Sequence, residues 1–301
     1  MYVPDIEVHQ ATTLEETAAA LGRYAPDARL LAGGTDLLVD LKTGRVRVGH
    51  LISINRIGAL RGITEEDGLL RIGALTTITQ LGRSPLVRER FAPLLDATRE
   101  MAAPQIRNVA TVGGNIASAV PCADLPPILI AMNASVRLWS QAGERDVLLH
   151  EFFAGPRRTV LQDGELLTLV FVPRPPARFG AAYARFALRD GNAIAVAAVA
   201  ASLLLARDHT VREARLVLGA VAPIPQLVAA AAVELAGRAP SEEAFDKAAE
   251  TARQAADPIS DVRGSADFRR ELVGVLARRA LKTAWQRASG APRAPDATAP
   301  G

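Results

Sequence analysis

The chain has 301 residues, of which 49% are hydrophobic, 22% charged and 4% aromatic, and its formal net charge is +3. This composition is typical of a water-soluble globular protein that is long enough for two or three units with cores of their own. Because the basic residues are mostly arginines interleaved with acids, and because aromatics are scarce, we expect no nucleic-acid-binding surface.

Residues 1–56 predict a small βαβ-like unit around a glycine turn. Thr13-Leu-Glu-Glu16 has the pattern of a capping box, which starts a helix. Gly33 and Gly34 follow an apolar strand and precede Thr35-Asp36, so the backbone can approach a ligand closely and helix N–H groups can bind phosphate. Most turns of this kind bind nothing, and one alone is a weak signal. The elements expected here are Leu14–Tyr24, Arg29–Ala32, Asp36–Lys42 and His50–Ile54.

A second Gly-Gly pair strengthens the phosphate interpretation. Residues 110–116 have the sequence Ala-Thr-Val-Gly-Gly-Asn-Ile, which again places a hydroxyl residue beside two glycines. Two such turns could hold a diphosphate from both sides. The elements expected over residues 57–176 are the strand Leu69–Gly73, a helix from Thr77 to about Arg83, a long amphipathic helix over Arg88–Met101, a helix that starts at Leu125 and the strands Ser135–Ser140, Arg145–Leu149 and Glu165–Val172.

The segment Arg174-Pro-Pro-Ala177 interrupts this pattern and predicts a domain boundary. Three strand-like runs with short connections follow it, which predicts an antiparallel meander. An apolar stripe on the last helix is expected to face the core, although it could also bind a partner. These elements are the strands Ala181–Leu188, Ile194–Ala206 and Val211–Val221, the helices Val228–Leu235 and Glu242–Ala255, and the stripe of Phe268, Leu272, Leu276, Leu281 and Trp285.

Other kinds of site have little support in the sequence. Cys122 is the single cysteine, so an internal disulfide and a four-cysteine iron–sulfur or zinc site are excluded within this chain. The four histidines lack metal-ligand spacing, and no catalytic triad or dyad is recognisable, so we predict no metal ligand and no catalytic residue. No signal peptide is recognisable, and the apolar run from Ala193 to Ala206 is too short to span a bilayer. We therefore expect a cytoplasmic protein without a membrane span.

Taken together, the two glycine turns resemble those of a known family, the FAD-binding medium subunits of molybdenum hydroxylases, which include carbon monoxide dehydrogenase, xanthine dehydrogenase and 4-hydroxybenzoyl-CoA reductase. The resemblance covers about residues 1–287. The cysteine-bearing insertion of the last-named enzyme is missing between Asn115 and Asp124, so its four-iron cluster is not expected. The segments that carry the resemblance are Ala32–Asp36, Ile106–Ile116, Ala123-Asp124, Gly164-Glu165, Gly191–Val196 and Asp261–Arg270.

The resemblance implies an α+β fold. It consists of a two-subdomain FAD-binding fold of the vanillyl-alcohol-oxidase (PCMH) type and a C-terminal domain with a three-stranded antiparallel sheet and helices. The implied units are residues 1–56 and 57–176 for the two FAD-binding subdomains, 177–287 for the C-terminal domain and 288–301 for a disordered tail. FAD is expected to lie between the domains.

The resemblance also implies which residues bind the cofactor. Several alternatives stay open: Asp124 could instead cap the helix at Leu125, Asp36 could cap its own helix rather than contact phosphate, Arg185 could be a surface residue and Ile194 plain core. The implied contacts with the diphosphate and ribityl groups are Leu31, Ala32, Gly33, Gly34, Thr35, Asp36, Leu37, Ala110, Thr111, Gly113, Gly114 and Asn115; Ser118 and Asp124 bind the polar middle, Met101 and Ile106 flank the cofactor, and Leu166, Leu167, Arg185 and Ile194 approach the flavin ring or the adenine end.

The function implied is that of an oxidoreductase subunit. A large subunit with the molybdenum cofactor would oxidise the substrate, a small subunit with 2Fe-2S clusters would relay electrons to FAD on this chain, and an external acceptor would take them. A dimer of such heterotrimers is expected. The alternatives are a self-contained flavin-dependent oxidoreductase of the same fold and a non-enzymatic module that binds a phosphate-bearing metabolite or a protein.

Overall fold

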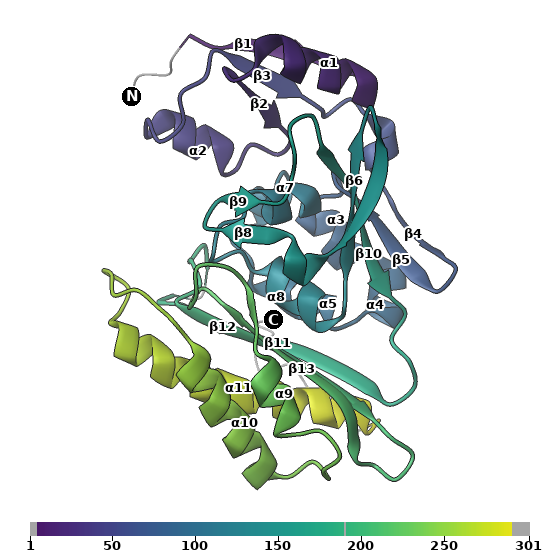
Figure 1. Ribbon diagram of the computed structural model, residues 1–301, viewed down its shortest axis with the longest axis vertical. Helices are drawn as coiled ribbons and strands as arrows, with labels where there is room; N and C mark the ends of the chain where they lie inside the picture. Colours follow the sequence, from purple (N-terminus) through teal and green to yellow (C-terminus); the bar gives the residue numbers. More distant parts are fainter. Residues whose placement is uncertain (1–4, 190, 291–301) are drawn as a thin grey trace, which may run out of the picture.

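The computed structural model describes residues 5–189 and 191–290, and its three main sheets follow one another along the long axis of the molecule (Figure 1). Helix α11 (Ala266–Ala288) ends inside the predicted tail, whose remainder from residue 291 lies outside the described residues. Within the described ranges, no helix combines the length and the apolar character needed to cross a membrane.

The N-terminal sheet is parallel, with strands in the order β1 (Glu7–Gln10), β3 (His50–Ser53) and β2 (Ala28–Leu31). Helices α1 (Leu14–Tyr24) and α2 (Leu37–Lys42) complete it, so the predicted βαβ-like unit forms. The hydroxyl of Thr13 accepts a bond from the Glu16 N–H, but the Glu16 carboxylate accepts from Thr12 rather than from Thr13. Strand β1 escaped prediction because its sequence, Glu-Val-His-Gln, is polar and largely exposed.

The central sheet is antiparallel, and its strand order brings residues 63–73 beside residues 135–173. Helix α3 (Ile78–Arg83) begins with the predicted cap: the Thr77 hydroxyl accepts from Gln80 N–H, while Thr77 N–H donates to the Gln80 side chain. The strands in order are β4 (Ile63–Glu66), β5 (Leu69–Gly73), β10 (Leu166–Pro173), β6 (Ser135–Ser140) and β7 (Gly143–Leu148), and β8 (Phe153–Gly155) and β9 (Arg158–Thr159) form a separate hairpin.

The long helix predicted over Arg88–Met101 is wrong. The structure has two short helices, α4 (Pro85–Arg90) and α5 (Leu94–Glu100), separated at Pro93. Proline has no N–H for the hydrogen-bond ladder of a helix, and its ring clashes with the preceding turn. The break was missed because both short helices contribute apolar residues to the same core, so the apolar periodicity of the sequence continues across it. The other helices of this part are α3 (Ile78–Arg83), α6 (Pro104–Arg107), α7 (Val112–Ala117) and α8 (Leu125–Ala131), with 3-10 turns at Gly58–Leu60 and Leu149–Glu151.

The C-terminal sheet is the predicted antiparallel meander with a short fourth strand added. It consists of β11 (Phe179–Phe186), β12 (Ala197–Leu205), β13 (Val211–Gly219) and β14 (Gln226–Leu227). Successive residues of β12 alternate between two cores: Val199 and Ala201 face helices α10 (Glu242–Ala255) and α11, whereas Ala198 and Ala200 face the core around α8. A strand covered on both faces has no polar side, which explains its continuous apolar sequence.

Helix α8 lies between the two larger sheets, and all seven of its residues are buried. It packs against β12 and β13, and the Ser202 hydroxyl donates to the Ala131 carbonyl at 2.7 Å. One continuous core cluster therefore contains residues from the glycine-turn region, from α8 and from the C-terminal sheet.

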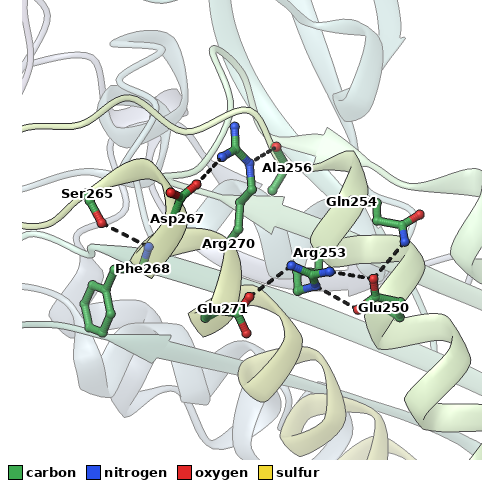
Figure 2. Close-up of polar contacts among 9 residues, drawn as sticks. All are labelled: Glu250, Arg253, Gln254, Ala256, Ser265, Asp267, Phe268, Arg270 and Glu271. Carbon is green, nitrogen blue, oxygen red and sulfur yellow. Dashed lines mark hydrogen bonds and ion pairs between the residues drawn. The ribbon is translucent and has the colours of Figure 1, made fainter.

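Helices α10 and α11 cover the outer face of the C-terminal sheet, with α9 (Ala229–Val233) preceding them (Figure 1). Figure 2 shows Arg253 of α10 between Glu250, 2.7 Å away, and Glu271 of α11, 3.0 Å away. The predicted stripe on α11 packs mainly into the core through Leu276 and Leu281, but Phe268, in its first turn, is 43% exposed.

Candidate cofactor-binding site

The first glycine turn, residues 32–36, connects the carboxyl end of β2 to α2. Gly34 has a φ of +73°, a conformation that glycine adopts without strain, and its carbonyl accepts from Leu38 N–H. The Asn55 amide donates to the Ala32 carbonyl at 2.9 Å and holds the entry to the turn. Asp36 occupies the N-cap position of α2 but makes no side-chain cap bond, so the capping role considered for it is wrong.

Gly33 brings the first turn against the second. A Cβ built on Gly33 would lie 2.0 Å from the carbonyl oxygen of Val109 and 3.2 Å from Cα of Ala110. Only a residue without a side chain fits at this distance. The two turns therefore lie side by side in the fold, although 76 positions separate Gly33 from Val109 in the sequence. Their proximity is the spatial relationship that a shared dinucleotide site requires.

The second glycine turn, residues 110–115, includes the start of α7. The Thr111 hydroxyl accepts from Gly114 N–H at 3.0 Å, and Gly113 N–H donates to the Ala74 carbonyl at 2.9 Å. A Cβ on Gly113 would lie 2.6 Å from Cβ of Ala74, so this glycine is required for packing against the loop after β5. The N–H groups of residues 110 and 112–115 are therefore already engaged by the protein, whereas the Thr111 N–H donates to no acceptor within the described residues.

The first turn differs in its donors. Within the described residues, the N–H groups of Gly33, Gly34, Thr35 and Asp36 donate to no protein acceptor. Unengaged N–H groups next to a helix start favour an anion. Within the described residues, the first turn thus offers four unengaged N–H groups and the second turn one, that of Thr111.

Asn115 carries an unpaired polar atom. Its Oδ1 is buried and accepts no hydrogen bond within the described residues. A buried acceptor without a donor costs about 1–3 kcal/mol, so a ligand that brings a hydroxyl or N–H group would relieve that cost. Ser118, one turn further along the chain, uses its hydroxyl to donate to the Asn115 carbonyl at 3.3 Å.

Asp124 lies at the centre of a buried polar group. Its Oδ1 accepts from the Tyr183 hydroxyl at 2.7 Å and lies 3.2 Å from Nη1 of Arg185. It makes no side-chain cap bond to α8, so the alternative that it merely caps this helix is wrong. Arg185 also donates to the Ala193 carbonyl and lies 3.4 Å from Glu100, and its side chain is only 3% exposed, so the alternative of a surface residue is wrong as well.

Burial controls the ionisation of this group. It raises the pKa of Asp124 above the usual range, because desolvation outweighs the opposing effects of Arg185 and the Tyr183 hydroxyl. Burial, together with the nearby Asp124 charge, raises the pKa of Tyr183 well above its ordinary value. Tyr183 therefore stays a neutral hydrogen-bond donor to Asp124.

Cys122 precedes Asp124 by two positions and is partly buried. Burial raises the pKa of the Cys122 thiol, and the charges of Asp124 and Asp36 add to that effect while Arg263 opposes it. A thiol with a raised pKa is a poor nucleophile, which agrees with the absence of a catalytic cysteine from the prediction.

The remaining predicted residues lie at different depths. Met101, Leu166 and Leu167 are buried, and Ile106 packs on the central core. Ile194 is 55% exposed, so the alternative that it is a core residue is wrong. Leu31 and Leu37 pack against the small core cluster of Leu41, Val48 and Leu51. Sequence reasoning missed Tyr183 and Glu100, because neither belongs to a motif and only the fold brings them to Arg185.

The motif Asp261–Arg270 forms a separate ion-pair cluster. Asp261 accepts from Arg263 at 2.6 Å and also pairs with Arg269, which is buried. Arg269 further donates to the carbonyls of Val196 and Ala220, both at 3.5 Å. This motif therefore joins the start of α11 to the ends of strands β12 and β13.

Comparisons with known proteins agree with this geometry. Residues 4–175 match the family described as FAD binding domain in molybdopterin dehydrogenase, and residues 181–284 match the CO dehydrogenase flavoprotein C-terminal domain. The chain is 37% identical over 288 residues to the carbon monoxide dehydrogenase medium chain of Hydrogenophaga pseudoflava, covering 95% of this chain and 99% of that one.

Two further similarities are as extensive. The xanthine dehydrogenase FAD-binding subunit of Escherichia coli O157:H7 is 35% identical over 285 residues, covering 94% of this chain and 97% of the relative. A solved structure of carbon monoxide dehydrogenase from Hydrogenophaga pseudoflava, which lacks the Mo-pyranopterin moiety of the molybdenum cofactor, superposes with a TM-score of 0.92 at 38% identity, over 95% of this chain and 99% of that one.

Proposed function

The chain belongs to the family of FAD-binding medium subunits of molybdenum hydroxylases, and we propose that it holds FAD against its two adjacent glycine turns and the Asp124 group. It is the electron-transfer subunit of a heteromeric oxidoreductase in which the substrate is oxidised on a partner chain. The observation that carries the cofactor site is the contact between Gly33 and the backbone at Val109, which brings the two turns together.

The residues present fit a dinucleotide in three respects. The unengaged N–H groups from Gly33 to Asp36 suit a diphosphate, which is anionic. The unpaired Oδ1 of Asn115 suits a hydroxyl or amine donor of the ligand. Thr111 and Ser118 add hydroxyls at the two ends of α7, although both hydroxyls already form hydrogen bonds with the protein.

When bound, FAD supplies chemistry that transfers one or two electrons, and this chain has to bind it, orient it and exclude water. The Asp124, Tyr183 and Arg185 side chains are held by one another, so their positions are fixed before a ligand arrives. Such fixed polar groups orient a ligand without the cost of ordering flexible side chains. Because the substrate is oxidised on a partner chain, this chain requires no acid or base that acts on the substrate.

We assign the cofactor contacts as the sequence implied them. The first turn with its flanks and residues 110–115 would contact the diphosphate and ribityl groups. Ser118 and Asp124 would bind the polar middle, and Met101 and Ile106 would flank the cofactor. The exposed side chain of Ile194 and the side chain of Arg185 would approach the flavin ring or the adenine end. Leu166 and Leu167 lie in β10 and would contribute through packing.

Membership of this family also leads to our proposals for the partner subunits and for the domains of the chain. We propose a small iron–sulfur subunit and a large molybdenum subunit, assembled with this chain into a dimer of heterotrimers that reduces an external acceptor in the cytoplasm. We also propose three units, residues 1–56, 57–176 and 177–287, and the extents of the two family matches support the division between the last two.

Flavin binding by the isolated full-length chain tests the cofactor site. The chain, expressed without partners and titrated with FAD, should bind one equivalent and acquire a flavin absorbance spectrum. A chain that takes up no FAD at any concentration would contradict the proposal. Oxidation of an organic donor by the isolated chain would instead favour the self-contained flavoenzyme, and co-purification from the native host identifies the partners.

A further inference from the structure

Two histidines and a glutamate converge on the outer edge of the N-terminal sheet. Strand β1 pairs in parallel with β3, and Glu7 is the direct neighbour of His50 in this register. His9 lies two residues beyond Glu7 on the same strand, so all three side chains leave the same face of the sheet. No metal ligand was predicted among the histidines because 41 positions separate His9 from His50 in the chain.

The distances between the potential ligand atoms match a metal site. Nε2 of His9 lies 3.0 Å from Nδ1 of His50, and the Glu7 carboxylate oxygens lie 3.8 Å and 3.6 Å from these two nitrogens. Zinc bonds of about 2.0–2.1 Å in tetrahedral geometry separate neighbouring ligand atoms by about 3.3 Å, close to all three values. A hydrogen bond between the rings would explain the shortest distance, but the two distances to Glu7 are too long for hydrogen bonds.

The surroundings hold the rings in place. Tyr24, the last residue of α1, stacks on His50 with ring centroids 4.1 Å apart and on His9 at 4.5 Å. The two histidine side chains are 22% and 24% exposed, whereas Glu7 is 66% exposed. Tyr24 thus covers one side of the ring pair, and the site opens to solvent on the side of Glu7, where water can complete the coordination.

We propose that Glu7, His9 and His50 bind one divalent transition-metal ion, of which Zn²⁺ is the best match. Two imidazoles and one carboxylate are a common ligand set for zinc and leave a fourth position for water. Within the described residues no other group of three such side chains has its ligand atoms this close together.

The site is separate from the cofactor site. His50 begins β3 and is the register partner of Ala28, the first residue of β2, whereas the first glycine turn follows the last residue of β2. The two sites are therefore at opposite ends of the same parallel strands. The ion would join β1 to β3, which is a structural role, and its binding requires no FAD.

Zinc binding by the full chain tests the proposal, with the protein expressed without a histidine tag. After dialysis against a chelator, one equivalent of Zn²⁺ should bind by calorimetry and raise the thermal unfolding midpoint. Co²⁺ should bind in its place and give the intense visible bands of a tetrahedral ion. Glu7→Gln, His9→Gln and His50→Gln should each weaken binding by more than the roughly 10–100-fold that loss of an outer partner costs.

His150→Gln is the matched control, because His150 lies 3.9 Å from Glu151 but has no third ligand beside it among the described residues. This variant should bind zinc as the parent chain does. Glu7→Gln changes an exposed side chain and keeps the fold, so it remains informative if a histidine variant unfolds. The proposal is overturned if the parent chain binds no zinc, if Glu7→Gln binds it equally well, or if cobalt gives only weak octahedral bands.

Discussion

Arg185 and Asp124 form an ion pair that joins the C-terminal sheet to the start of α8, with Nη1 and Oδ1 3.2 Å apart and the two side chains 3% and 10% exposed. The pair lies beside Tyr183, which donates to the same carboxylate oxygen. Charges removed from water this completely are costly unless each has its partner, so each residue depends on the other.

Asp124→Asn should destabilise the chain strongly. The substitution keeps the shape and an acceptor for Tyr183, but it leaves the buried Arg185 guanidinium with the exposed Glu100 as its remaining carboxylate partner among the described residues. Loss of one partner from a buried ion pair costs about 3–5 kcal/mol, which urea denaturation would measure. Asp146→Asn is the control, because Asp146 pairs with Arg137 at the surface and its loss should cost below about 1 kcal/mol. Equal effects of the two substitutions would contradict the prediction.

Gly33→Ala should separate the two glycine turns. The new methyl group would lie 2.0 Å from the Val109 carbonyl oxygen, so the backbone must move, at a cost of about 1–3 kcal/mol or more. We expect FAD occupancy, measured by absorbance per mole of purified protein, to fall at least tenfold, which corresponds to about 1.4 kcal/mol. Gly22→Ala, in α1 with nothing within 4 Å of its new methyl, should leave occupancy unchanged. Full occupancy in Gly33→Ala would remove the basis for a shared site.

Asn115→Leu should affect free and FAD-bound protein in opposite ways. Replacing the unpaired amide by an apolar side chain of similar size removes an unsatisfied acceptor, so the FAD-free chain should be equally stable or more stable. FAD affinity should fall about tenfold for the loss of one hydrogen bond. Asn108→Ala, whose amide oxygen already accepts from Thr79, should leave the affinity unchanged. Thermal unfolding and FAD titration check both halves, and unchanged affinity in Asn115→Leu would show that this amide does not contact the cofactor.

Acid should destabilise the C-terminal part of the chain through Glu250 and Asp261. Hydrogen bonds from Arg253 and Gln254 lower the pKa of Glu250 to about 2, and bonds from Arg263 and Arg269 hold the pKa of Asp261 well below its usual range. A carboxylate whose pKa is lower in the folded state contributes stability above its unfolded pKa and loses it as pH falls. The unfolding midpoint should therefore decrease between about pH 5 and pH 2.

Asp261→Asn separates this effect from general acid unfolding. The variant lacks the titrating group, so its midpoint should be lower than that of the parent at pH 7 and should decrease less on acidification. Parallel pH profiles for the parent and the variant would contradict the assignment to Asp261. Added salt should weaken the contribution of the exposed Glu250 more than that of Asp261, because screening acts mainly on solvated charges.

Local chemistry in the sequence accounts for the parts of the fold that could be predicted. The cap at Thr77, the turn at Gly34 and the meander after residue 177 depend on neighbouring residues, and the structure contains each of them. The single helix predicted over Arg88–Met101 is wrong because apolar periodicity continued across Pro93, whose missing N–H and ring prevent an unbroken helix through this position; the backbone leaves the helix at Phe91. Strand β1 was not predicted because an exposed edge strand has no buried side, and its sequence therefore lacks an alternating apolar pattern.

The candidate site was predicted as a set of motifs but not as an arrangement. The pairing of Asp124 with Arg185 spans 61 positions, and no local pattern indicates that an arginine will be buried. For the same reason, the proximity of His9 and His50, which are 41 positions apart, could not be predicted from the sequence. Contacts of this kind depend on how sheets and helices pack, which a single sequence does not specify.

The position of α8 has a consequence for protein engineering. Its buried apolar residues share one core cluster with Ala181, Tyr183, Ala198, Ala200 and Val217 of β11 to β13, although the two groups lie on opposite sides of the segment Arg174–Ala177 in the chain. A chimera that exchanged only the C-terminal portion between two relatives at this segment would pair mismatched apolar surfaces. Grafts that carry α8 together with the meander preserve native complementarity, and these are the crossovers from which hybrid subunits should be built.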